Sequence, residues 1–300
     1  MMDVQRRHAQ VPLGIGCIMA GIFCLTISDS LAKWLGATYS PLQLLFLRGL
    51  LATPVLVVLV IASSGRPALR TRHLDIYMLR GLMNVVSASC FYLSLTMLPL
   101  AEVTAIAFSA PLFVTIMSVA FLDEKVSPGG WMALLAGFAG VLLIVRPSPQ
   151  HMQWAAMLPL ITAMGYAVMM VSARRINARE SMLTTMLYIA LGQVVFTSLP
   201  QVWVWEPVQT GHFVGFMGLA VFSTMGLGLI TQAFRVAPAS TVAPFDYSGL
   251  IWATLIGWLV WREVPSLWFY AGAFLIAGGG VYIALMEVSK KKAKAAPSGS

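Results

Sequence analysis

LPLAEVTAIAFSAPLFVTIMSVAFLDEKVS, residues Leu98–Ser127, occurs a second time in this sequence as APASTVAPFDYSGLIWATLIGWLVWREVPS, residues Ala237–Ser266. The copies align without a gap, at the one constant shift that places Pro99 on Pro238. The other identical pairs are Val103 and Val242, Ser109 and Ser248, Thr115 and Thr254, Glu124 and Glu263, and Ser127 and Ser266. Each copy has a proline where a helix tolerates one, then a long apolar segment, then an acidic residue. This pattern predicts a duplicated membrane-spanning unit.

The composition places the chain in a membrane. Hydrophobic residues make up 59% of the sequence and charged residues 10%, and the mean hydropathy is +0.83. A soluble globular protein carries roughly 25% charged residues to cover its wetted surface. The cysteines Cys17, Cys24 and Cys90 lie in apolar runs without CxxC spacing, which favours buried thiols over disulfides or a metal site.

Apolar runs and turn residues divide the chain into ten predicted spans. Each span must be helical, because lipid offers no hydrogen-bond partner for free backbone groups. The expected fold is therefore all-α and integral to the membrane, with ten transmembrane helices arranged as two inverted five-helix repeats. The predicted spans are 12–33, 42–63, 74–97, 99–122, 129–146, 153–174, 182–200, 211–235, 238–260 and 265–287.

Lysine and arginine predict the orientation, because cytoplasmic loops are enriched in them. With the amino terminus inside, 15 of the 19 fall in cytoplasmic segments, and Lys33, Arg146 and Arg262 fall outside. The 15 are Arg6, Arg7, Arg66, Arg70, Arg72, Arg80, Lys125, Arg174, Arg175, Arg179, Arg235, Lys290, Lys291, Lys292 and Lys294. Since this positive charge lies in loops on one side, we do not expect nucleic acid as a partner. Both termini are expected to be cytoplasmic.

The repeat and the orientation together predict the domain organisation. The shift between the copies contains five spans, so the second copy crosses the membrane in the opposite direction, with Glu124 inside and Glu263 outside. We expect a cytoplasmic amino terminus over 1–11, five-helix repeats over 12–150 and 151–289, and a basic cytoplasmic tail over 290–300 attracted to lipid headgroups.

Two further features carry a resemblance to a known family. The spacing P-x12-E recurs here from Pro111 to Glu124, and glycine-rich segments read GWMALLAGFAGVLLI at Gly130–Ile144 and AGAFLIAGGGVYIAL at Ala271–Leu285. With the two repeats, the chain resembles the ten-span EamA-type exporters of the drug/metabolite transporter superfamily, most of all the bacterial amino-acid exporters. The resemblance implies a multi-pass protein of the bacterial inner membrane that works by alternating access. It also implies that spans 3, 4, 8 and 9 lie near the centre.

One departure from that family concerns the helices of the repeated stretch. Relatives often carry a proline in the second copy where this chain has Leu250, whereas the first copy has Pro111. Since proline is a common cause of helix kinks, we expect the first copy to be kinked and the second to be straighter.

Ionisable groups inside spans are costly and mark candidate sites. Asp29 and Arg48 are predicted at similar depth near the outer ends of the first two spans. One interpretation is a buried ion pair that joins the two helices, with Lys33 as a competing partner for Asp29. The other is recognition of a substrate carboxylate by Arg48, whose guanidinium suits bidentate contacts.

A set of aromatic and polar residues in the inner spans is predicted to line a substrate cavity, although ordinary helix packing would also use such residues. Asp246 stands out, because it lies within a span and no partner cation is evident. The predicted substrate-binding residues are Tyr92, Phe108, Ser109, Tyr166, Gln232, Asp246, Tyr247 and Trp252.

The sequence favours transport over catalysis. It contains no nucleotide-binding loop, metal-ligand cluster or nucleophile constellation, and its four histidines fall at span ends; we therefore expect no catalytic residue, cofactor or metal. The prediction is a secondary transporter, monomeric or homodimeric, that exports neutral and aromatic amino acids. The alternative is an importer or exchanger of a nucleoside-like or vitamin-like solute. A membrane enzyme, a scaffold and a channel are disfavoured.

Overall fold

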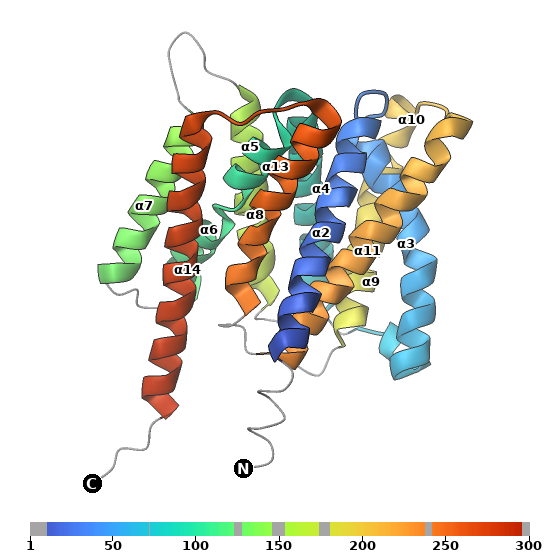
Figure 1. Ribbon diagram of the computed structural model, residues 1–300. Helices are drawn as coiled ribbons and strands as arrows, with labels where there is room; N and C mark the ends of the chain where they lie inside the picture. Colours follow the sequence, from blue (N-terminus) through green and yellow to red (C-terminus); the bar gives the residue numbers. More distant parts are fainter. Residues whose placement is uncertain are drawn as a thin grey trace.

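Helices make up all the regular structure of the computed structural model, which describes residues 11–71, 73–122, 128–145, 154–173, 181–237 and 242–295; no strand occurs in these ranges. The long helices lie side by side in one bundle (Figure 1). Within the described ranges, seven helical segments are long and apolar enough to cross a membrane. They are Pro12–Leu35, Pro41–Ser64, Leu74–Met97, Leu100–Phe121, Pro128–Val145, Trp154–Ser172 and Thr210–Ala233. The chain is thus a helical integral membrane protein. The expected total of ten transmembrane helices remains a prediction.

The first half of the chain begins with three long helices. They are α2 (Val11–Leu35), α3 (Pro41–Ser64) and α4 (Leu74–Met97), and the short 3-10 helix η1 (Arg66–Leu69) follows α3. Ser40 caps α3, because its Oγ accepts a hydrogen bond from the N–H of Gln43 at 3.2 Å. Three further helices complete this half: α5 (Leu100–Ala107), α6 (Ala110–Leu122) and α7 (Pro128–Val145).

The second half contains helices in the corresponding apolar segments. Its elements are η2 (Trp154–Ala156), α8 (Met157–Ala173), α9 (Met182–Ser198), α10 (Gln201–Val204), η3 (Thr210–His212), α11 (Phe213–Val236), η4 (Ala243–Tyr247), α13 (Ser248–Trp261) and α14 (Leu267–Ala295). The first residue of α2 and the last of α14 lie at the same end of the bundle (Figure 1).

Both copies of the repeated stretch are interrupted at matching positions. In the first copy, α5 ends at Ala107 and α6 begins at Ala110. Pro111 has no N–H to donate to the carbonyl of Ala107, which explains a break just before it. In the second copy, the 3-10 helix η4 gives way to α13 between Tyr247 and Ser248. We expected the second copy to be straighter, but it too departs from a continuous α-helix.

Glycines permit close contact where long helices cross. The helix α7 lies along α14 at one edge of the bundle (Figure 1), and Gly140 faces Gly272 there. A Cβ added to Gly272 would lie 2.5 Å from the carbonyl oxygen of Gly140. Gly21 and Gly226 make the same kind of approach between α2 and α11. Small residues at such crossings let backbones pack closely, which replaces the hydrophobic driving force that lipid removes.

Apolar side chains cover the outside of the bundle as well as its core. Tyr39, Tyr92 and Phe216 are among the largest fully buried side chains. On the outer surface, Phe274 is 77% exposed and Val58 is 64% exposed. Exposed apolar surface on this scale suits contact with lipid rather than with water.

We predict that the α7–α14 crossing depends on a missing side chain. Gly272→Ala should lower the thermal unfolding midpoint of the detergent-solubilised protein, because the new methyl group collides with the Gly140 carbonyl. Gly278→Ala on the same helix is the matched control, since a Cβ there meets no atom within 4 Å. Alanine favours a helix over glycine by about 1 kcal/mol, so the control should be neutral or more stable. Equal midpoints for the two variants would contradict this packing.

Candidate functional site

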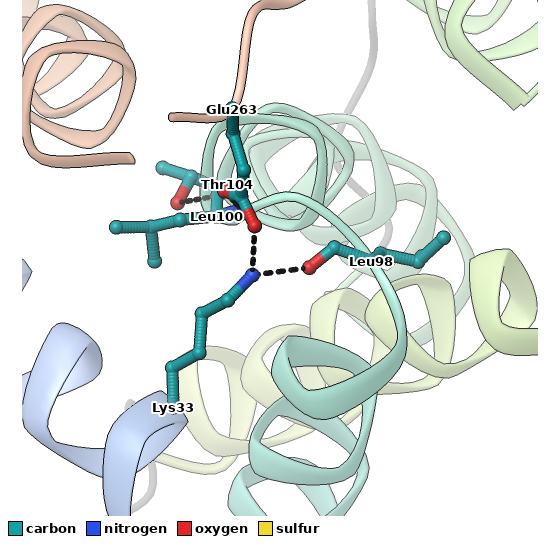
Figure 2. A network of polar contacts seen from close by, with 5 residues as sticks. All are labelled: Lys33, Leu98, Leu100, Thr104 and Glu263. Carbon is teal, nitrogen blue, oxygen red and sulfur yellow. Dashed lines mark hydrogen bonds and ion pairs between the residues drawn. The ribbon is translucent and has the colours of Figure 1, made fainter. Parts of the chain in front are cut away.

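An ion pair joins two helices that are far apart in the chain (Figure 2). The Nζ of Lys33, in the last turn of α2, donates to Oε1 of Glu263 at 2.5 Å and to the carbonyl oxygen of Leu98 at 2.8 Å. The other carboxylate oxygen of Glu263 accepts from the N–H of Leu100 at 2.9 Å. The two charged side chains are only 10% and 20% exposed. One carboxylate thus holds together the end of α2, the α4–α5 junction and the end of α13.

The end of α13 directs Glu263 into this contact. Arg262 adopts the left-handed conformation with φ 58°, which ends the helix. The N–H of Glu263 then donates to the carbonyl oxygen of Gly257 at 3.1 Å. A Cβ on Gly257 would lie 3.1 Å from Oε2 of Glu263, so glycine leaves room for the carboxylate. Lys33, expected as a competitor for Asp29, is instead bound to Glu263.

A second polar group surrounds Arg48 in α3. Its Nη1 donates to the hydroxyl of Tyr92 at 2.6 Å, and its Nη2 donates to Oε1 of Gln193 at 2.9 Å. The guanidinium also lies over the Tyr92 ring, 5.7 Å from its centroid. The Nε2 of Gln193 in turn donates to the carbonyl oxygen of Leu45 at 2.5 Å. These contacts hold the guanidinium between α3, α4 and α9.

Asp29 does not form a direct ion pair with Arg48. The ion pair of Lys33 with Glu263 is the single one within 4 Å that joins two described residues. Asp29 is nevertheless close enough to Arg48 for the two charges to interact. The predicted neighbourhood is therefore present, and the partners that hold Arg48 are uncharged.

The matching interruptions of the two copies bring a third group together. Phe108, between α5 and α6, packs against Tyr247 with ring centroids 5.4 Å apart. Asp246 precedes Tyr247, and its Oδ1 is buried without a hydrogen-bond partner. Tyr166 of α8 is close enough to Asp246 for electrostatic interaction. Its side chain is 47% exposed, so this group borders open space.

The remaining predicted site residues lie in different surroundings. Ser109 is fully buried, and its Oγ has no partner. Trp252 packs against Phe23 of α2 with ring centroids 5.0 Å apart, and its Nε1 is buried without a partner. Gln232 lies on an exposed part of α11. The structure thus groups Phe108 and Tyr247 with Asp246 and Tyr166, and it leaves Gln232 outside that group.

The sequence-based predictions of site residues do not include two residues, Gln193 and Arg80. Gln193 shows no signal, since a single glutamine in an apolar run also occurs as packing. Arg80 belongs to the predicted cytoplasmic charges, but the structure places it inside α4 with 4% of its surface exposed. Its Nη1 donates to the carbonyl oxygen of Met169 at 2.7 Å. Removing it leaves 14 (15 − 1) cytoplasmic charges against three, so the predicted orientation does not depend on it.

The described residues contain no group of three or more histidine, cysteine or acidic side chains placed to hold a metal ion. Cys17, Cys24 and Cys90 are free thiols; the predicted burial holds for Cys24, whereas Cys17 and Cys90 are half-buried.

Comparison with known proteins identifies a family of transporters. Residues 12–146 and 153–285 both match the EamA-like transporter family. An S-adenosylmethionine uptake transporter of Rickettsia bellii is 24% identical over 93% of this chain and 97% of its own length. A pseudopaline exporter of Pseudomonas aeruginosa is 27% identical over 93% of this chain and 96% of its own. A riboflavin transporter of Vibrio cholerae is 30% identical over 76% of this chain and 77% of its own.

A solved structure shares the fold. A protein crystal structure matches with a TM-score of 0.62 and 19% identity, over 90% of this chain and 98% of that chain.

We predict that Lys33 and Glu263 are energetically coupled. Lys33→Gln and Glu263→Gln should each destabilise the protein by about 2 kcal/mol, the scale of a hydrogen bond to a charged group. The double variant should lose less than the sum, because neither substitution then leaves a charge without its partner. Arg262→Gln, which removes the adjacent exposed cation, is the control. Additive losses in thermal unfolding would show that the two side chains act independently.

Proposed function

Because this chain belongs to the EamA-like transporter family, we propose that it is a secondary carrier that moves a small metabolite across the bacterial inner membrane by alternating access. The family is one of transporters, and the helical, apolar bundle agrees with that membership. The observation that carries the proposal is the junction of the two repeats, where Phe108 meets its counterpart Tyr247 beside an intramembrane carboxylate. Carriers built from inverted repeats place their substrate sites at such an interface.

The packing of the helices supports ten spans in two related halves. Counted along each half, α2 and α8 come first, α3 and α9 second, α4 and α11 third, the repeated stretches fourth, and α7 and α14 last. The first helix of each half packs on the third helix of the other, as α2 on α11 and α8 on α4. Helices of the same rank pack on each other, as α3 on α9 and α7 on α14. This reciprocity is what a two-fold relation between halves produces.

Side chains at one of these crossings follow the same relation. Gly226 of α11 faces Gly21 of α2, and Ser87 of α4 faces Gly165 of α8. The shift that places Pro99 on Pro238 also places Ser87 on Gly226. One member of each pair, Ser87 or Gly226, therefore occupies an equivalent position and faces a glycine of the partner helix, which favours a structural repeat over chance similarity.

We predict opposite membrane sides for the ends of the two copies. In a background with Cys17, Cys24 and Cys90 replaced by serine, single cysteines would be introduced by Lys125→Cys and Val264→Cys, which are equivalent positions of the repeated stretch. A membrane-impermeant maleimide applied to intact cells should label position 264 and should reach position 125 only after the cells are opened. Labelling of both positions from the same side would exclude the inverted arrangement. Lys125 lies outside the described residues.

For the substrate, we favour neutral and aromatic amino acids moved outward. The open side chain of Tyr166 and the Phe108–Tyr247 pair provide aromatic surface, and Asp246 provides one carboxylate. Burial of an apolar side chain stabilises binding by roughly 25 cal/mol per Å², and one methylene changes it by only about 1–3 kcal/mol. Discrimination among neutral amino acids is then loose. In this proposal the Asp29–Arg48 neighbourhood is structural, since Tyr92 and Gln193 already hold both terminal nitrogens of Arg48.

The names of the relatives support a second candidate equally well. S-adenosylmethionine joins an amino acid to a nucleoside, and riboflavin is a vitamin with a flat aromatic ring system. Proteins similar to this chain carry these names, and two of them are named for uptake or for transport without a stated direction. Import or exchange of a nucleoside-like or vitamin-like solute is therefore the alternative. Alternating access is reversible, so direction follows gradients and coupling.

We predict saturable transport by the purified protein, whose monomeric or homodimeric state would be recorded at the same time. Proteoliposomes would be tested with radiolabelled phenylalanine, methionine, threonine, S-adenosylmethionine and riboflavin. Uptake of the three amino acids at low affinity, with mutual competition, is the expected result. Protein-free liposomes are the control. Transport of riboflavin or S-adenosylmethionine without any amino acid would establish the second candidate, and transport of none would remove both.

A further inference from the structure

We propose that Arg80 binds the anionic group of the transported solute, opposite Asp246, which binds the cationic group. This inference rests on the proposed carrier function and names the charge pattern of its substrate, a zwitterion. It makes Arg80, in α4, a substrate-binding residue.

The position of Arg80 is unusual for a purely structural cation. It lies in α4, six residues after the helix begins at Leu74, which is about 9 Å along the axis at 1.5 Å per residue. Only 4% of its surface is exposed, and none of the described acidic side chains forms an ion pair with it. A buried charge without a counter-ion costs several kcal/mol. Charged residues in membrane spans therefore mark substrate or ion pathways by default.

The guanidinium of Arg80 has donors without a hydrogen-bond partner. It offers five N–H donors, and the described residues take one hydrogen bond from it, from Nη1 to the carbonyl oxygen of Met169. Its Nε is buried without a partner. The edge formed by Nε and Nη2 is the one that binds a carboxylate through two parallel hydrogen bonds. Arg48 differs in that each of its two terminal nitrogens already donates a hydrogen bond, to Tyr92 and to Gln193.

Other unpartnered polar atoms lie on the same helix face. Asn84 and Ser87 follow Arg80 at intervals of four and three residues, which places them on one side of α4. The Oδ1 of Asn84 and the Oγ of Ser87 are both buried without a hydrogen-bond partner. Buried polar groups are nearly always satisfied in folded proteins, so the Oδ1 of Asn84 indicates a missing ligand or water, whereas the Oγ of Ser87 packs against Gly165.

Tyr166 connects this row to Asp246. The charges of Asp246 and Arg80 both act on its hydroxyl, and it lies on α8 three residues before Met169, whose carbonyl oxygen accepts a hydrogen bond from Arg80. Arg80 and Asp246 do not pair with each other, and the Oδ1 of Asp246 has no partner. Two opposite charges that do not pair with each other and that both act on the same half-exposed tyrosine complement a solute that carries both charges and an aromatic or apolar body.

The test uses three probes that share one ring. Phenylalanine carries both charges, phenylalanine amide carries only the cation, and 3-phenylpropanoate carries only the anion. Equilibrium binding to the purified protein would be measured for the parent and for Arg80→Gln, Asp246→Asn and Arg48→Gln. Uptake of phenylalanine into proteoliposomes would be measured in parallel. The binding measurement tests the proposed site, and the uptake measurement tests the proposed carrier function.

We expect Arg80→Gln to weaken phenylalanine and 3-phenylpropanoate about tenfold or more, the effect of one lost charge-assisted contact, and to leave the amide unchanged. Asp246→Asn should weaken phenylalanine and the amide and leave 3-phenylpropanoate unchanged. A purely structural role for Arg80 would weaken all three probes alike. Unchanged binding of the amide also shows that the variant is folded.

Several results would overturn the proposal. These are equal weakening of all probes by Arg80→Gln, selective loss of the anionic probes in Arg48→Gln instead, and no binding of any probe by the parent. If Arg80→Gln does not fold, Arg80→Lys decides, because it keeps the charge but not the fork; selective weakening of the anionic probes supports the proposal, and uniform weakening removes it. Binding with the expected selectivity but without uptake would support the site and refute the proposed carrier function.

Discussion

The arrangement of this protein depends on the cost of leaving a charge unpaired in an apolar bundle. The ion pair of Lys33 with Glu263 avoids that cost at one end of the bundle. One oxygen of the Glu263 carboxylate binds the lysine, and the other accepts a hydrogen bond from the first backbone N–H of α5. Because α2 and α13 lie 230 residues apart at this contact, it ties the first helix of one half to the second copy of the repeated stretch. Any movement of one half against the other must break it or carry it along.

The same cost explains why the polar groups inside the bundle are few and separate. Arg48 is held by a tyrosine and a glutamine, which satisfy its donors without adding a negative charge. Asp246 and Arg80 have no such complement, and both carry buried polar atoms without partners. A carrier needs this imbalance, because a site that is satisfied by its own side chains has no interaction left for a substrate. Asp246 lies where the interrupted copies meet, Arg80 lies in α4 against α8, and the satisfied groups hold the helices around them.

The interruptions and the glycine crossings make that meeting possible. The regular α-helical hydrogen-bond pattern is interrupted at Phe108 and at Tyr247. At these interruptions the two large rings pack against each other. Close crossings at Gly140 with Gly272 and at Gly21 with Gly226 bring the supporting helices together without bulky contacts. The chain therefore combines tightly packed edges with a centre in which backbone and side chains are less regular.

The sequence alone determined the class of the protein, the positions of its helices and the family to which it belongs, because apolar runs, turn residues and a repeated stretch are local features. It also singled out Phe108, Tyr247, Asp246 and Arg48, since polar or aromatic residues within apolar spans stand out by type. Only the tertiary structure paired Lys33 with Glu263, assigned Gln193 to Arg48 and placed Arg80 inside the bundle. Those facts depend on which helices pack together and how each is rotated about its axis. Both are set by contacts between residues far apart in the chain, which no local pattern records.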